Sequence, residues 1–156
     1  MSRPSIVLDD VSKKMIRVLQ EDCTLPHVRL WQRLGIKRTT FSHRLRILRD
    51  QGVILGYRAI VDPEKVGLEI TALLHVGFDG RRAKDIEKFQ TRLRVCPHVL
   101  DCYEMASDGG YTLKIVAANL GELKKVVDEL IWDVACTMRL DIATRTIKMG
   151  AIVPIR

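Results

Sequence analysis

Long apolar runs are absent from this 156-residue chain. No stretch approaches the roughly 20 apolar residues that a membrane-spanning helix needs. The N-terminal segment MSRPSIVLDD also lacks the apolar core of a signal peptide. We therefore expect a cytoplasmic protein that has no membrane partner.

Patterns typical of metal sites and active sites are also missing. The four cysteines, Cys23, Cys96, Cys102 and Cys136, show no Cys-x-x-Cys spacing. Cys96, His98 and Cys102 have no fourth ligand nearby, and their spacing matches no common zinc pattern. No nucleophile elbow, phosphate-binding loop or metal-binding helix occurs either. The sequence predicts reduced cysteines, no cofactor and no enzymatic activity.

Positive charge is concentrated in the N-terminal part of the chain. Residues 1–60 hold 12 Lys and Arg against 5 Asp and Glu, whereas the other 96 residues hold 14 of each sign. Because Lys and Arg neutralise DNA phosphates, this asymmetry favours a nucleic-acid-binding module joined to a neutral domain. A basic face that only confers solubility is the alternative. We place the domain boundary between residues 62 and 63, which gives domains 1–62 and 63–156.

Apolar periodicity predicts three helices in the basic part, at about residues 9–22, 27–34 and 38–50. Gly35 ends the second helix, because glycine enters a left-handed turn at little cost. The inward-facing residues are expected to be Val28, Trp31 and Leu34 in the second helix and Phe41, Leu45 and Leu48 in the third. After Gly52 the period changes to two, which predicts a strand or wing over residues 53–61.

The second and third of these helices have the spacing of a helix-turn-helix, whose second helix enters the major groove of DNA. The third helix is rich in side chains that bind base edges and phosphates. Base-edge candidates are Arg38, Thr39, Ser42, His43 and Arg46, with Thr40 beside them. Phosphate-contact candidates are Arg29, Lys37, Arg44 and Arg49. The alternative is a solvated polar face, which is more plausible for one residue such as His43 than for the whole set.

The second half follows the order β-α-β-β-α-β. Strands are expected over residues 70–79, 99–106, 111–118 and 138–149, with helices over 83–95 and after the capping residue Asn119. Residues 152–155 could add a short strand. This order predicts an α+β, ferredoxin-like domain with two helices on one face of a four-stranded antiparallel sheet. Leu73, Val116 and Ala118 would leave the other face apolar, so we expect at least a homodimer.

The N-terminal half resembles the Lrp/AsnC family of leucine-responsive and asparagine-linked transcription regulators. The residues that carry the resemblance are Leu8, Asp9, Ile16, Leu19, Gln20, Asp22, Leu30, Leu34, Gly35, Ile36, Arg44, Leu48, Gly52, Val53, Ile54, Gly56, Tyr57, Asp62 and Pro63. The second half, entered at Gly67, is similar to the RAM-type sensor domain of that family. The resemblance implies binding of double-stranded DNA, dimers that can assemble further into octamers, and control by an amino acid or related small molecule bound at the interface between sensor domains.

Three positions depart from the family pattern. Trp31 replaces a small alanine where two helices approach closely, and Lys37 replaces a capping serine worth about 1 kcal/mol. The effector hairpin of the family would be Asp108, Gly109, Gly110, Tyr111 and Thr112 here, with Thr112 in place of a carboxylate. A hydroxyl cannot pair with an ammonium group as a carboxylate does. The effector would therefore differ from a simple amino acid, bind through backbone groups, or be absent. Residues 108–110 equally fit a plain tight turn.

Two other functions remain open at this point. Sirohaem decarboxylases resemble this two-domain architecture, but the chain offers only His27, His43, His75 and His98 to line a tetrapyrrole cavity. A protein that wraps DNA with little sequence preference is the other alternative. Absorption by a bound tetrapyrrole would indicate the enzyme. Salt-sensitive binding without sequence discrimination would indicate the architectural protein.

Overall fold

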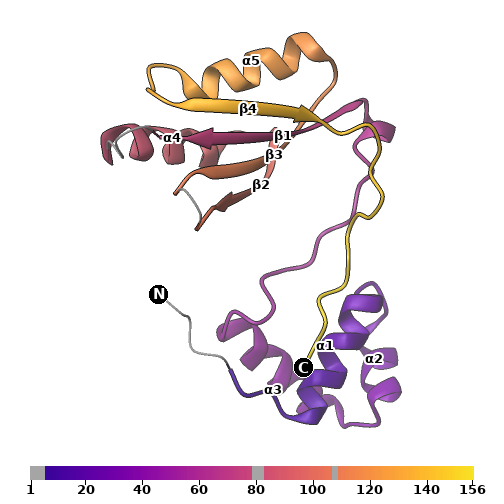
Figure 1. The fold of residues 1–156 in the computed structure, drawn as a ribbon. Coiled ribbons are helices and arrows are strands. Elements are labelled where there is room, and N and C mark those ends of the chain that lie inside the picture. Colours follow the sequence, from indigo (N-terminus) through magenta and orange to yellow (C-terminus); the bar gives the residue numbers. More distant parts are fainter. Residues whose placement is uncertain (1–5, 79–82, 107–108) are drawn as a thin grey trace. The chain divides into compact units, whose positions relative to one another are not determined.

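The computed structural model describes residues 6–78, 83–106 and 109–156. They divide into two compact units, each described here by itself (Figure 1). The first contains the residues up to Ile60 together with Lys148–Arg156, and the second contains Val61–Ile147. The boundary at residues 62 and 63 remains a prediction.

Three helices form the first unit, as the sequence predicts: α1 (Asp10–Glu21), α2 (His27–Leu34) and α3 (Arg38–Asp50). Asp9 caps α1, because its side chain accepts a hydrogen bond from the Ser12 backbone N–H. Gly35 follows α2 in the left-handed conformation, with φ 65°. The backbone N–H groups of Gly35 and Ile36 donate to carbonyls of the last turn of α2, and this closed turn sets the direction of α3.

The buried face of α2 differs from the expected one. Leu30 is 1% exposed, whereas Val28 is 48% exposed. The expectation that Val28 faces inward is therefore wrong. An eight-residue helix has only about two turns, too few to fix the phase of the apolar pattern. A small error in that phase therefore exchanges the residues predicted to face inward with those predicted to face outward. Trp31 is half-buried and packs its ring against Phe41, with 6.4 Å between the ring centroids.

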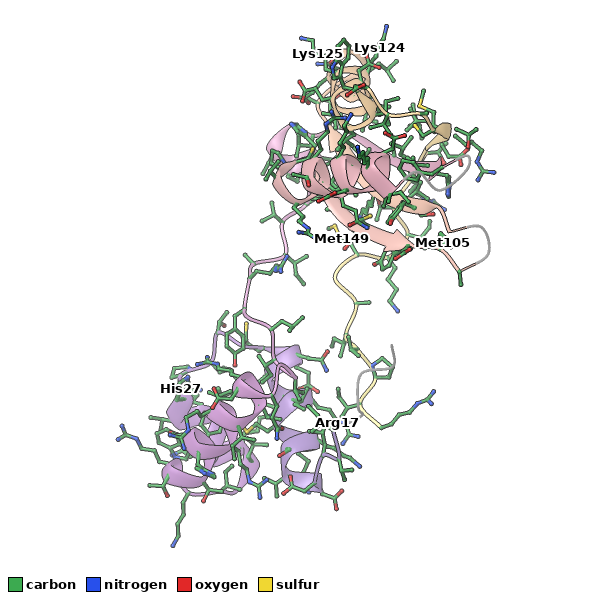
Figure 2. All side chains as sticks on the ribbon, turned by 90° about the vertical axis from the view of Figure 1, so that its left-hand side faces the viewer. Arg17, His27, Met105, Lys124, Lys125 and Met149 are labelled. Carbon is green, nitrogen blue, oxygen red and sulfur yellow. The ribbon has the colours of Figure 1, made fainter. Side chains whose placement is uncertain are left out.

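The strand predicted over residues 53–61 is not formed. These described residues are coil, and no other strand of the first unit supplies backbone partners. The final segment 152–155 is coil too, but Gln20 on α1 anchors it: Val153 donates its backbone N–H to the Gln20 side chain and accepts a hydrogen bond from it. Arg17, labelled in Figure 2, donates to the Ile155 carbonyl. The C-terminal residues therefore belong to the helical unit.

The second unit confirms the predicted β-α-β-β-α-β order. After a short 3₁₀ helix (Glu64–Val66), its elements are β1 (Ile70–Gly77), α4 (Ala83–Val95), β2 (Val99–Glu104), β3 (Tyr111–Ala117), α5 (Leu120–Ile131) and β4 (Thr137–Ile142). The antiparallel sheet has the order β2-β3-β1-β4, and α4 and α5 cover one face (Figure 1). Asn119 caps α5 as expected. Phe89 of α4 and Leu123 and Leu130 of α5 pack on Leu74 and Leu113 in the core.

Strand β4 ends at Ile142, not at residue 149. Its last partner in the register is Ala72, and one further backbone bond joins Ala143 to Thr71. Because β1 begins at Ile70, which lies opposite residue 144 in this register, residues beyond 144 have no part of β1 to pair with. The apolar alternation after Ile142 was therefore insufficient to continue the strand.

The face of the sheet opposite the helices is less apolar than expected. Leu73 is 40% exposed, but Val116 is only 2% exposed and is already buried in the single chain. Larger exposed apolar side chains lie along the edge strand β4, where Met138, Leu140 and Ile142 are 39–55% exposed. The edge strand β4 is thus one apolar surface that the single chain leaves open.

Replacing Leu30 with alanine tests the corrected face of α2. Leu30→Ala should lower the free energy of unfolding by about 2–5 kcal/mol, because it leaves a cavity in the core. Val28→Ala should cost about 0.5 kcal/mol or less, because its side chain is half exposed. Denaturant unfolding in a Trp132→Phe background, followed by Trp31 fluorescence, measures both. A larger effect at Val28 than at Leu30 would contradict the burial described here.

Candidate DNA-binding helix and effector pocket

Helix α3 separates its apolar and polar residues on opposite sides. Phe41, Leu45 and Leu48 are buried against α1 and α2. Nine of the ten predicted DNA-binding residues are exposed: Arg29, Lys37, Arg38, Thr39, Thr40, Ser42, His43, Arg46 and Arg49. Lys37 precedes α3 without a side-chain capping bond, as expected from its lack of a capping oxygen. The geometry leaves the N-terminal half of α3 open to a nucleic acid.

A shallow depression on α3 lies within this polar surface. Thr39, Thr40, His43, Arg44 and Ile47 line it, and its volume is about 470 Å³. Ile47 is 36% exposed and adds an apolar contact surface among the hydroxyl and basic groups. Such a mixture suits contact with base edges and thymine methyl groups.

Arg44 has a structural role that the sequence did not reveal. Its guanidinium binds the Asp9 carboxylate and the Ser12 hydroxyl, which joins α3 to the start of α1. The Ser12 backbone N–H, the Ser12 hydroxyl and then Arg44 lower the pKa of Asp9 from 3.8 to about 2. A phosphate contact by Arg44 would compete with this ion pair. Its assignment to DNA therefore remains a prediction with less support than that of its exposed neighbours.

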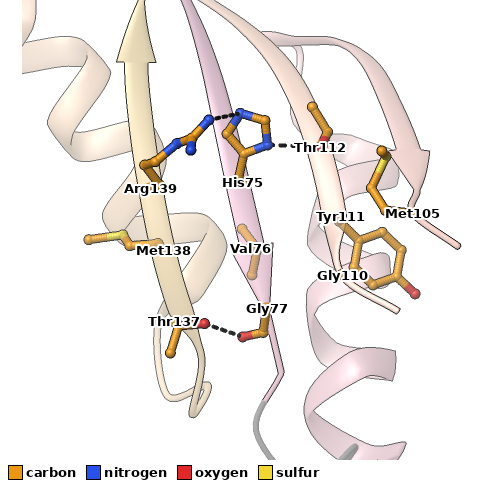
Figure 3. A pocket seen from close by; sticks show the side chains of 10 residues that line it. All are labelled: His75, Val76, Gly77, Met105, Gly110, Tyr111, Thr112, Thr137, Met138 and Arg139. Atoms are coloured by element: carbon orange, nitrogen blue, oxygen red, sulfur yellow. Dashed lines mark hydrogen bonds between the residues drawn. The ribbon is translucent and has the colours of Figure 1, made fainter. Parts of the chain in front are cut away.

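The second unit contains a pocket of about 430 Å³ at one end of the sheet (Figure 3). It lies between β1, β4 and the hairpin that joins β2 to β3. Its lining residues are His75, Val76, Gly77, Met105, Gly110, Tyr111, Thr112, Thr137, Met138 and Arg139. Of the predicted effector residues, Gly110, Tyr111 and Thr112 line it, Gly109 does not, and Asp108 lies outside the described residues.

A row of three side chains crosses the pocket. His75 on β1 is directly opposite Thr112 on β3 and Arg139 on β4 in the sheet register. His75 Nδ1 lies 3.0 Å from Thr112 Oγ1, and Arg139 Nη2 lies 3.4 Å from His75 Nε2 (Figure 3). Asp141, two residues along β4, accepts a 2.9 Å hydrogen bond from Arg139 Nε and lies 3.5 Å from His75 Nε2. Thr112, His75 and Arg139 thus place hydrogen-bond donors and acceptors on the face of the sheet that α4 and α5 do not cover.

Sequence reasoning missed His75, Met105, Thr137 and Arg139 as pocket residues. They come from strands far apart in the sequence, and only the register of the sheet brings them together. One signal was available: His75 is a basic residue at an outward position of a mostly apolar strand.

Family models match both parts of the chain. A model of the Lrp/AsnC ligand binding domain matches residues 71–152, and a winged helix-turn-helix DNA-binding model matches residues 8–54. The chain is 32% identical to the proline dehydrogenase transcriptional activator of Rhizobium radiobacter, over 80% of each protein. It is 30% identical to the transcriptional regulator AzlB of Bacillus subtilis, over 96% of this chain and 97% of that one.

Solved structures share the fold. A transcriptional regulator of Neisseria meningitidis, solved as an L-Met complex, superposes with a TM-score of 0.84 at 26% identity and covers 95% of this chain and 97% of that one. An AsnC family regulator from Agrobacterium tumefaciens has the same TM-score at 24% identity, with 94% and 97% covered.

These matches define a DNA-binding regulator that a ligand modulates, built from a winged helix-turn-helix and an α+β ligand-binding domain. The chain belongs to the Lrp/AsnC family. It is a transcriptional regulator and not an enzyme of similar architecture. Within the described part of the chain, no helix is long and apolar enough to cross a membrane.

The lowered pKa of Asp9, caused first by its hydrogen bonds from Ser12 and then by Arg44, predicts a pH-dependent stability. A carboxyl with a lowered pKa in the folded state stabilises above its unfolded pKa, and this contribution is lost as the pH falls through the folded value. Asp9→Asn keeps a capping oxygen but removes the charge. It should lower the melting temperature at pH 7, and the gap from the native protein should close between pH 4 and about 2. Calorimetry at several pH values measures this gap.

Asp10→Asn is the matched control, since Asp10 lies in the first turn of α1 without the Arg44 contact. Its effect should be smaller than that of Asp9→Asn at pH 7. A gap for Asp9→Asn that is the same at pH 7 and pH 3 would show that the charge of Asp9, held by Ser12 and Arg44, does not stabilise the unit.

Proposed function

We propose that α3 binds the major groove of double-stranded DNA and reads bases there in a sequence-specific way. The observation that carries this proposal is the exposed polar face of α3, which stands on a helix fixed by Phe41, Leu45 and Leu48. Arg38, Thr39, Thr40, Ser42, His43 and Arg46 are the proposed residues at the bases. Arg29, Lys37, Arg44 and Arg49 are the proposed phosphate contacts. Because its target is DNA, we place the protein in the cytoplasm.

We further propose that a small molecule bound at the pocket of Figure 3 modulates this binding. Gly110, Tyr111 and Thr112 are the proposed hairpin contacts, together with Asp108 and Gly109 of the same turn. The L-Met complex of the Neisseria regulator supports a compound related to amino acids.

Homodimers, and higher assemblies such as octamers, are the proposed working form. Two surfaces support a second copy. Leu55 and Ile60 are 90% and 67% exposed on a coil segment whose backbone has no strand partner among the described residues. Leu140 and its apolar neighbours are exposed along the edge strand β4. An exposed edge and apolar side chains together favour association between chains.

Arg46→Ala tests the base-reading role of α3. Loss of a side chain that bonds a base edge should weaken binding to selected DNA by about 1–3 kcal/mol and weaken binding to random DNA much less. Fluorescence anisotropy titrations on a fragment selected by the protein from a random library, and on a scrambled fragment, measure both affinities.

Lys124→Ala is the control of equal charge, because Lys124 is exposed on α5 in the other unit (Figure 2). It should leave both affinities nearly unchanged. Equal losses of Arg46→Ala on the two fragments would make Arg46 a phosphate contact. If the native protein itself fails to discriminate between the fragments, the protein is an architectural DNA binder.

Leu140→Glu tests association through β4. A buried carboxylate at an interface between copies should raise the dimer dissociation constant by at least about tenfold, because its desolvation is not compensated. Sedimentation equilibrium measures this constant. Lys125→Glu on α5 changes charge at an exposed site away from β4 and should have no such effect. An unchanged dimer with Leu140→Glu would exclude the β4 edge as the interface.

A further inference from the structure

Arg49, near the end of α3, lies over the ring of Tyr57. Its guanidinium carbon is 5.3 Å from the centre of that ring. Both residues belong to the helical unit, and both reach solvent: Arg49 is exposed and Tyr57 is 43% exposed. A cation at this distance over an aromatic ring is attracted by the negative face of the ring. The contact therefore restricts where the Arg49 guanidinium can lie.

The turn after α3 brings Tyr57 to this place. Gly52 has φ 68°, a backbone conformation that glycine adopts at little cost. The backbone N–H groups of Val53 and Ile54 then both donate to the Leu48 carbonyl, at 2.9 and 3.1 Å. Val53 and Ile54 also pack against the core of the unit. The chain is thus fixed against the last turn of α3, three residues before Tyr57.

The ring holds Arg49 in a different way from the way a carboxylate holds Arg44. Asp9 forms an ion pair with Arg44, and a DNA phosphate would have to compete with that carboxylate. The Tyr57 ring has no net charge, so it does not neutralise the guanidinium that it contacts. A guanidinium keeps its positive charge at any ordinary pH, and its fork of N–H groups matches two phosphate oxygens. Arg49 is therefore held in a form that can bind an anion.

The position of Arg49 on α3 suits a phosphate contact. Arg49 follows Arg46, a proposed base contact, by three residues, so the two side chains are neighbours on the helix surface. Phosphate contacts fix the register of a recognition helix on the duplex, whereas base contacts supply the specificity. A free Arg side chain loses rotamer entropy when it binds, and a contact that already restricts it reduces this loss.

We propose that Tyr57 is a positioning residue for DNA binding, whose ring holds the Arg49 guanidinium for a phosphate of the DNA backbone. Through this side chain, the segment 53–61 contributes to DNA binding although it forms no strand. The inference deepens the proposed function and rests on it, because it takes α3 as the DNA-binding helix.

Substitutions of Tyr57 test the role of the ring. Fluorescence anisotropy titrations of the full chain use the selected and the scrambled fragment. Tyr57→Leu should weaken binding to both fragments by about threefold or more and in equal proportion, because a phosphate contact carries no sequence information. Tyr57→Phe keeps the ring and should bind like the native protein. An unchanged affinity of Tyr57→Leu, or an equal loss with Tyr57→Phe, would overturn the role of the ring.

A double-mutant cycle distinguishes positioning from a general effect on the fold. Arg49→Gln should weaken binding to both fragments and should reduce the slope of log affinity against log salt concentration by about one. In the Arg49→Gln background, Tyr57→Leu should cause no further loss, because no guanidinium remains for the ring to hold. The same loss from Tyr57→Leu in both backgrounds would show that Tyr57 does not act through Arg49.

Lys37→Gln is the matched control for the cycle. Lys37 is exposed and is a proposed phosphate contact at the opposite end of α3, roughly 18 Å from Arg49 along the helix axis. The losses from Lys37→Gln and Tyr57→Leu should therefore add. Coupling of Tyr57 to Lys37 as strong as its coupling to Arg49 would overturn the specific pairing.

The same titrations distinguish this inference from the function on which it rests. If the native protein discriminates between the two fragments but Tyr57 and Arg49 are not coupled, only the positioning role is overturned. If the native protein binds neither fragment, the proposed function is overturned and the positioning role with it.

Discussion

The register of β1 between β3 and β4 determines the chemistry of the ligand-binding unit. It sets His75 opposite Thr112 on one side and opposite Arg139 on the other. Side chains alternate between the faces of a sheet, so a shift of one residue in either pairing would move a member of this row into the core. Ala72, Leu74 and Val76 of β1 prevent this shift, because they are held in the apolar core under α4 and α5. Packing on one face thereby fixes the polar row on the other.

A different constraint organises the helical unit. Phe41 is fully buried and contacts the rings of both His27 and Trp31, so α3 is held against α2 along its first turns. The pair of Arg44 and Asp9 holds the next turn of α3 against the start of α1. Ser42 and His43 lie between these contacts and are exposed, as are Arg38, Thr39 and Thr40 in the first turn. The contacts of Phe41 and Arg44 on the opposite side of α3 thus hold the proposed DNA surface in place.

Most of the fold could be predicted from the sequence, because helices and strands with one buried face leave a periodic pattern. The bounds of α2, α3 and α4 were correct, and the caps Gly35 and Asn119 were recognised from residue type. The errors in the strands arose where an alternating pattern lacked a neighbouring strand, whereas the error at Val28 was one of helix phase. Residues 53–61 alternate like a strand but have no strand beside them in the single chain, and β4 stops where β1 no longer runs alongside it.

The sequence predicted the residues of the DNA surface more completely than those of the pocket, and for a related reason. The DNA surface occupies one helix, so periodicity alone places its residues on one side. The pocket draws on three strands and a hairpin, and nothing in the local sequence connects His75 with Arg139. The replacement of a carboxylate by Thr112 was visible in the sequence, but its consequence was not. Only the register shows that this hydroxyl faces an imidazole and that the nearby cation is Arg139.

The course of the chain links the two units twice. It passes from the helical unit into β1, and it returns after β4 to residues that bind α1 through Gln20 and Arg17. The strand that carries Arg139 is therefore continuous with the segment anchored on the first helix. A regulator needs its ligand-binding and DNA-binding parts to be coupled, and packed or covalent connections can carry such coupling. In this chain, β4 and its C-terminal continuation are such a connection, formed by covalent bonds and ending at identified hydrogen bonds.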